Sequence, residues 1–169
     1  MDVPSKLTIS EEQYVHYVEC INSLNQAWFI LQELRKAKSK SAIHAAAFRF
    51  ALVEYAKPYN SSYGIHKSRK KREAYKLSPP NLLPEDMALH QQILDLRDQV
   101  LAHSDLTLKE AVLYLGSYGG RLNFGIASSS IAQFPDIEAV IRLIERTLDV
   151  MYAERTRLEE ALAASPKTK

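Results

Sequence analysis

Two side chains near the end of one predicted helix, Arg97 and His103, could take part in acid–base or phosphate chemistry. The helix is predicted from about Glu85 to His103, and at about 100° per residue Arg97 falls in the middle of its apolar arc. A guanidinium there needs a partner, because burying an unpaired charge is costly. His103 falls at one margin of the arc, about 9 Å along the axis from Arg97. Each residue also has a structural interpretation: Arg97 as half of an ion pair or as an arginine extended under a loop, and His103 as a helix C-terminal residue favoured by the macrodipole.

The sequence around this pair is more specific than either residue alone. Residues 96–105 read Leu-Arg-Asp-Gln-Val-Leu-Ala-His-Ser-Asp. This run resembles the Arg-x(4–6)-His signature of the HEPN superfamily (higher eukaryotes and prokaryotes nucleotide-binding domain), and it is closest to HEPN proteins of the abortive-infection type. Five residues separate Arg97 from His103, where four is the common spacing. Asp98 occupies the polar position that is frequently Asn.

The resemblance implies a metal-independent endoribonuclease, or an RNA-binding protein, of a defence or toxin–antitoxin type system. By that analogy His103 would act as general base or acid on the ribose 2′-hydroxyl or the leaving 5′-oxygen, which suits a side chain that titrates near neutral pH. Arg97 would bind the scissile phosphate and stabilise its developing charge, and Asp98 would orient the other two residues. The resemblance also implies no metal or cofactor, a homodimer with a composite active site at its interface, and a cognate antitoxin as a further partner. The alternative is a non-catalytic helical dimerisation or interaction module in which the motif shapes an interface.

The net charge of +2 conceals a strongly basic segment. Residues 57–76 contain seven Lys and Arg and one acid, Glu73, which gives this window a charge of +6 and the rest of the chain −4. We expect part of this segment to neutralise RNA phosphates, with Tyr63 or Tyr75 stacking on a base. The predicted RNA-binding residues are Lys67, Arg69, Lys70, Lys71 and Arg72. A solvated loop is the alternative, and a membrane-surface segment is disfavoured because the run lacks an apolar face.

Hydrophobic periodicity predicts a mainly helical chain. Besides the helix that ends at His103, we expect helices from Ser10 to about Ala37, from Ala42 to about Lys57, and from about Asp136 onward. The 169 residues fit one domain. The predicted fold is therefore all-α, a four-helix up-down bundle of HEPN type in a single domain over residues 1–169.

The segments between these helices are predicted to differ in kind. Residues 58–82 are expected to form a long loop with a short helical turn around residues 66–75. Residues 111–127 carry β-forming residues on both sides of Gly119–Gly120, which predicts a β-hairpin between the third and fourth helices. A two-stranded hairpin is marginal alone, so we expect it to pack on the helices. The tail, residues 165–169, is expected to be disordered.

Other residue types argue against several classes of protein. The lone Cys20 allows no internal disulfide and argues against a cysteine-based zinc site. One thiol fits a reducing cytosol, and we expect Cys20 to lie in the core. The histidines show no metal-ligand spacing, and no P-loop or GxGxxG is present. No apolar run approaches the roughly 20 residues of a membrane span, and no apolar signal core is found near the N-terminus. We therefore expect a cytoplasmic protein with no membrane partner.

One further arginine is a candidate for the site. Arg49 lies among apolar residues of the second predicted helix. We expect it to point inward, where it would pair with Asp95 or Asp98 or extend the phosphate site.

Overall fold

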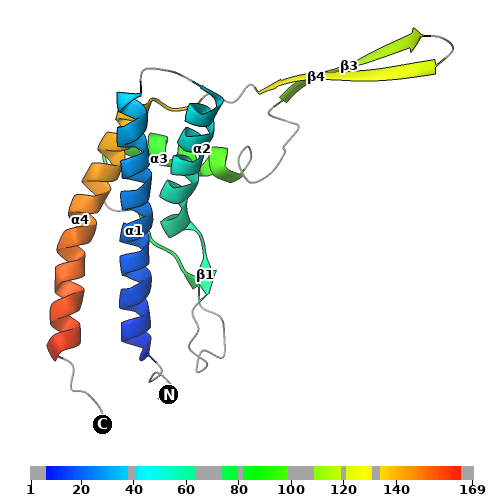
Figure 1. Cartoon of the computed structure of the whole chain (residues 1–169). Coiled ribbons are helices and arrows are strands. Elements are labelled where there is room, and N and C mark those ends of the chain that lie inside the picture. The colour runs from blue at the N-terminus through cyan, green and yellow to red at the C-terminus, as the bar shows by residue number, and fades with distance from the viewer. Residues whose placement is uncertain are drawn as a thin grey trace, which may run out of the picture.

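The computed structural model describes residues 7–37, 41–63, 74–79, 82–98, 109–118, 121–130 and 134–164. This part of the chain is mostly helical, which confirms the predicted class. Its four α-helices are α1 (Ile9–Lys36), α2 (Ala42–Ala56), α3 (Pro84–Leu96) and α4 (Ile137–Ala164). In Figure 1, α1 lies between α2 and α4, and the shorter α3 lies toward the end of the helical body opposite the two termini.

The helices begin where polar side chains can bind free backbone amides. Thr8 forms a capping box with Glu11: its hydroxyl accepts from the Glu11 amide at 3.2 Å, and the Glu11 carboxylate accepts from the Thr8 amide at 2.7 Å. Ser41 caps α2 by accepting from the His44 amide, and Asp136 accepts from the Ala139 amide at the start of α4. The predicted starts are therefore correct to within about two residues.

The hydrophobic core lies where α1, α2 and α4 meet, with α3 packed against it. Each of the three long helices contributes side chains with no exposed surface, among them Leu24 and Leu31 of α1, Leu52 of α2 and Leu143 of α4. Cys20 is also buried in this core, as predicted. From α3 come Ile93 and Leu96. Apolar burial of this kind is the main favourable term in folding.

The segment predicted as a loop over residues 58–82 contains regular structure. A short 3-10 helix, η1 (Lys57–Tyr59), follows α2 directly and buries Pro58 and Tyr59. Two short strands, β1 (Ser62–Tyr63) and β2 (Ala74–Tyr75), then pair antiparallel. The predicted helical turn at residues 66–75 is therefore wrong at Ala74 and Tyr75, and its other residues to 73 lie outside the described part of the chain. The strands β1 and β2 were not predicted because two residues are too few to show a hydrophobic periodicity.

The predicted β-hairpin is confirmed, with strands β3 (Lys109–Tyr118) and β4 (Arg121–Ser130) in antiparallel register from Lys109 opposite Ser130 to Tyr118 opposite Arg121. The expectation that it packs on the helices is wrong. Figure 1 shows the hairpin projecting away from the helical body, and Leu113 and Leu115 are 58% and 66% exposed. Alternation predicts strands well, but it does not say what their apolar face will contact.

The remaining predictions about the fold concern the end of the third helix, the C-terminal tail and membrane-spanning segments. The third helix is described as far as Asp98, so its predicted extension to His103 lies outside the described residues, as does the tail at residues 165–169. Within the described ranges, none of the helices combines the length and the hydropathy that crossing a bilayer requires.

The core packing predicts a large effect for one substitution in α1. Leu24→Ala removes a side chain with no exposed surface, so we expect the free energy of unfolding to fall by about 2–5 kcal/mol. Phe29→Ala on the same helix is the matched control, because Phe29 is 62% exposed, and we expect a change within about 0.5 kcal/mol. Urea denaturation followed by circular dichroism measures both, and similar losses for the two variants would contradict this description of the core.

Candidate functional site at the end of helix α3

Arg97 and Asp98 lie at the C-terminal end of α3 and pair with each other. The Arg97 backbone amide donates to the carbonyls of Ile93 and Leu94, so the backbone remains helical at Arg97. The Nη1 atom of Arg97 donates a hydrogen bond to Oδ1 of Asp98, and the two atoms are 2.5 Å apart. The side chain of Arg97 is 33% exposed and that of Asp98 61% exposed. The pair is thus an ion pair at the surface.

On a helical wheel Arg97 lies between His90 and Ile93, about 20° from the first and about 40° from the second, so it falls within the buried arc of α3, as predicted. Its side chain is nevertheless 33% exposed, because it follows Leu96, the last buried side chain of α3. The partner that a guanidinium needs is the adjacent Asp98.

The other predicted site residues lie outside the part of the chain that the structure describes. His103 lies outside the described residues, and so do the predicted RNA-binding residues Lys67, Arg69, Lys70, Lys71 and Arg72. The structure does describe the residues on either side of this stretch of the basic segment. Residues 64–73 connect β1 to β2, so they start and finish at the paired residues Tyr63 and Ala74. In Figure 1, β1 lies toward the end of the body nearest the termini, whereas α3 lies toward the opposite end.

One of the two tyrosines proposed to stack on a base already has a protein partner. The ring of Tyr75 stacks on His16 of α1, with centroids 5.0 Å apart and an interplanar angle of 27°. The pKa of His16 is lowered by burial, although Glu12 acts in the opposite direction. This stacking attaches β2 to α1, so one face of the Tyr75 ring is not available to RNA.

Arg49 does not take the position predicted for it. It is exposed on α2, and its guanidinium lies 5.6 Å from the ring centroid of Phe134 in a cation–π contact. Asp98 pairs instead with Arg97, and Asp95 accepts a hydrogen bond from Gln91. The predicted inward pairing of Arg49 with either carboxylate is wrong, because α2 turns the side of Arg49 toward the segment before α4.

Two buried polar side chains of α3, Asp86 and His90, hold the helix in place. Near its start, Asp86 is 6% exposed and pairs with Arg146 of α4. One turn later, His90 is 3% exposed, and its Nδ1 forms a hydrogen bond of 2.8 Å with the hydroxyl of Tyr55 of α2. Tyr59 packs edge-on against the His90 ring, with centroids 4.5 Å apart. Arg97 lies about 10 Å beyond His90 along the helix axis, so these contacts determine where the end of α3 lies.

Burial changes the ionisation of this cluster. It raises the pKa of Tyr55 far above its usual range and that of Tyr59 to about 12. It lowers the pKa of His90, and Lys76 acts in the same direction. All three groups are therefore neutral near pH 7, which is consistent with a positioning role.

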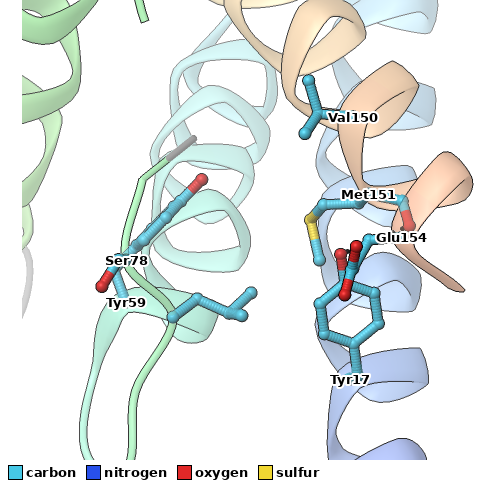
Figure 2. Close-up of a pocket in the computed structure, with 7 residues that line it drawn as sticks. Tyr17, Tyr59, Ser78, Val150, Met151 and Glu154 are labelled. Atoms are coloured by element: carbon cyan, nitrogen blue, oxygen red, sulfur yellow. Dashed lines mark hydrogen bonds between the residues drawn. The ribbon is translucent and has the colours of Figure 1, made fainter. Parts of the chain in front are cut away.

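A small cavity adjoins this cluster at Tyr59. It has a volume of about 200 Å³ and opens between the segment from η1 to Ser78 on one side and α1 and α4 on the other (Figure 2). Tyr59 and Ser78 lie opposite Tyr17 and Met151, with Leu77, Val150 and Glu154 completing the described lining. Burial raises the pKa of Tyr17 to about 12. The sequence did not predict this cavity, because its lining residues come from three distant segments and share no motif.

Among the residues that the structure describes, no group of three or more His, Cys, Asp or Glu side chains lies close enough together to bind a metal ion.

The pKa of the Cys20 thiol is raised to about 11, mainly by burial and to a smaller extent by Glu19. A raised pKa makes a thiol unreactive near neutral pH, so Cys20 is a core residue.

The neutral, buried His90 predicts a dependence of stability on pH. The ordinary pKa of histidine is 6.5, and that of folded His90 is lower, so below about pH 6.5 the unfolded chain binds more protons than the folded chain. We expect the free energy of unfolding to fall as the pH is lowered from 7.5 to 5.5, and His90→Asn to reduce that fall. Urea titrations at both pH values measure it.

Tyr55→Phe is the matched control for this prediction. It removes the hydrogen bond to His90 and should lower the free energy of unfolding by about 1 kcal/mol, but it keeps a buried histidine and hence the pH dependence. An unchanged slope with pH in His90→Asn would show that His90 is not the group that titrates.

Comparisons with protein-family models, with curated proteins and with solved structures found no match to this chain. The features of the chain that bear on its function are therefore the residues at the end of α3 and the basic segment.

Proposed function

We propose that this protein is a metal-independent endoribonuclease of HEPN type, acting as a homodimer in a defence or toxin–antitoxin type system. The observation that carries the proposal is the position of Arg97. It lies at the accessible end of a helix that is fixed by buried contacts, within a motif that continues to His103.

The Arg97–Asp98 pair leaves the guanidinium available to a phosphate. Exposed ion pairs contribute only about 0–1 kcal/mol, because water and salt screen them. A phosphate can accept two parallel hydrogen bonds from one guanidinium, which makes it a strong competitor for Arg97. The Asp98 carboxylate would then turn to His103 or to solvent. An arginine sealed in the core could not exchange partners in this way.

The proposed chemistry is cleavage by the neighbouring 2′-hydroxyl. His103 takes the 2′-hydroxyl proton, and the 2′-oxygen forms a bond to the phosphorus atom. The bond from phosphorus to the 5′-oxygen breaks, and a histidine acting as general acid returns a proton to that oxygen. The products are a 2′,3′-cyclic phosphate and a free 5′-hydroxyl. Arg97 stabilises the charge that develops on the phosphate.

The basic segment would supply affinity. Lys67, Arg69, Lys70, Lys71 and Arg72 would bind RNA phosphates. These contacts would hold the RNA strand, while Arg97 and His103 act on the scissile phosphate. Positioning of this kind raises affinity and leaves the chemical step to Arg97 and His103.

A non-catalytic interaction module is the second candidate, and the exposed apolar residues of the hairpin favour it. In that case the motif would shape an interface and would not cleave RNA. The exposure of Arg97 is common to both candidates, because a residue at an interface between two chains also faces water in the single chain, and RNA cleavage is what distinguishes them. Failure of the wild-type protein to cleave any of a set of defined RNAs, as a dimer and with or without chelator, would favour the module.

The decisive measurement is cleavage of defined RNAs in the presence of EDTA, with analysis of the product ends. We expect the wild type to leave 2′,3′-cyclic phosphates, His103→Ala to abolish cleavage, and Arg97→Ala to lower the single-turnover rate by about 10²–10³-fold, as for loss of one donor to a developing anion. His44→Ala and Arg157→Ala are matched controls, because His44 belongs to α2 and Arg157 to α4, and neither is part of the motif. Cleavage by His103→Ala at the wild-type rate would remove His103 from the mechanism.

The basic segment makes a separate prediction about affinity. Replacing Lys70, Lys71 and Arg72 together by Ser should weaken RNA binding and reduce the slope of log Kd against log salt concentration by about 2, since three phosphate contacts are lost. The single-turnover rate at saturating RNA should not change. Fluorescence anisotropy over a salt series measures the first and quench kinetics the second. An unchanged salt slope would mean that the segment does not contact RNA.

A further inference from the structure

The cavity shown in Figure 2 is lined mostly by apolar groups. Leu77, Val150 and Met151 supply aliphatic carbon and a thioether, and Tyr17 and Tyr59 supply aromatic rings. The cavity volume of about 200 Å³ exceeds the roughly 150 Å³ of an apolar protein cavity that binds benzene. A ring or an alkyl chain of about six to eight carbon atoms therefore fits this cavity by volume.

Oxygen atoms gather on one wall of the cavity. The Tyr17 hydroxyl donates a hydrogen bond to the carbonyl oxygen of Met151, and the two oxygen atoms are 3.3 Å apart. Figure 2 shows Tyr17, Met151 and Glu154 together on this wall, opposite Tyr59 and Ser78. The Glu154 carboxylate lies close enough to Tyr17 to raise the pKa of its phenol, after the larger effect of burial. Because the Tyr17 proton is directed to the carbonyl, the phenol oxygen remains free to accept a further hydrogen bond.

The charge of this wall is negative. Glu154 is the only charged residue among the described residues that line the cavity. Its side chain is 44% exposed, and it pairs with Arg157, which lies 3.5 Å away and is 79% exposed. Water and salt screen an exposed ion pair of this kind, so it contributes little to stability. A cation that also fills the cavity can therefore replace Arg157 as the partner of Glu154.

We propose that this cavity binds a small primary amine, with the ammonium group beside Glu154 and Tyr17 and the apolar body between Met151 and the Tyr59 ring. An ammonium group has three hydrogen-bond donors and no acceptor, which matches a carboxylate beside a phenol oxygen. Tyrosine rings also attract a cation through their π-electrons. None of these residues belongs to the motif at the end of α3, so amine binding does not depend on the proposed cleavage of RNA.

Other ligands of the same size match this lining less well. A neutral molecule would cover part of the Glu154 carboxylate with apolar atoms and offer it no charged donor, which is unfavourable. A carboxylic acid would place a second negative charge beside Glu154, and like charges at close range repel. The volume thus selects a ring or a short chain, and the charge selects an amine.

The first test compares three probes that share one ring and differ in charge: benzylamine, benzyl alcohol and benzoate. Each is titrated into the full-length protein at pH 7, where benzylamine is protonated, and binding is followed by calorimetry and by the amide NMR signals of Tyr17, Leu77 and Met151. We expect benzylamine to bind about tenfold more tightly than benzyl alcohol, as for one hydrogen bond between charged groups. Benzoate should show no saturable binding.

Glu154→Gln tests the role of the carboxylate, because it removes the charge and keeps the size of the side chain. We expect the affinity for benzylamine to fall about tenfold, to that for benzyl alcohol, and the affinity for benzyl alcohol to stay the same. Glu160→Gln is the matched control, since Glu160 is exposed on the same helix and is not among the lining residues. It should bind both probes as the wild type does.

A second variant tests whether the probes occupy the cavity. Val150 lies at its edge and is 52% exposed, so Val150→Trp places a large ring at the opening and should weaken the binding of benzylamine and benzyl alcohol alike. Tyr152→Trp is its control, because Tyr152 contacts Asn25 and does not line the cavity. Circular dichroism establishes that each variant is folded.

Three results would each overturn the proposal. The wild type could fail to bind benzylamine, it could bind benzyl alcohol equally well, or Glu154→Gln could keep the full affinity for benzylamine. Loss of RNA cleavage in the variants of Arg97 and His103 would be unaffected by any of these results, since it is measured without an amine.

Discussion

The attachment of α3 to the rest of the protein depends on two buried polar side chains. Of the four buried residues of α3, Asp86 and His90 are polar, and Ile93 and Leu96 are apolar. The partner of Asp86 is Arg146, whose side chain is 43% exposed, so the ion pair is only partly buried, but loss of Arg146 would leave the buried Asp86 carboxylate without this partner. The hydrogen bond between His90 and Tyr55 adds about 1 kcal/mol. These contacts join α3 to α4 and α2 at defined positions, whereas apolar packing alone tolerates sliding between surfaces.

This attachment explains how a surface arginine can be placed accurately. Asp86 and His90 fix the direction of the helix, and Ile93 and Leu96 then set its depth in the core. Arg97 follows directly, one residue beyond the last buried side chain. Its backbone position is thus determined by the core, while its guanidinium is partly exposed and pairs with Asp98. A phosphate-binding residue needs both properties, since a rigid support lowers the cost of binding and exposure permits exchange.

The sequence predicts the parts of this structure that depend on local rules. The capping residues Thr8 and Ser41, the proline at the start of α3 and the alternation in β3 and β4 identify elements through their own amides and side chains. The contacts of Arg97 and Arg49 were not predictable, because each depends on how far a helix turns toward its neighbours. Nor was the exposure of the hairpin. Alternation identifies an apolar face, but only the arrangement of separate elements decides whether the same chain covers it. The part of the candidate site that was predicted is the motif itself.

The arrangement also separates the charge of the protein from its proposed chemistry. The −4 body leaves the +6 segment at residues 57–76 as the main attraction for a polyanion. Its strands β1 and β2 are attached to α1 through Tyr75 and His16, whereas Arg97 belongs to a helix at the other end of the body. An RNA strand that touches both the strands β1 and β2 and the end of α3 would have to be longer than one that touches α3 alone. Long RNA would therefore gain affinity from both regions and short RNA from one. Salt should then weaken binding of long RNA more steeply than binding of short RNA, because the long strand makes more phosphate contacts.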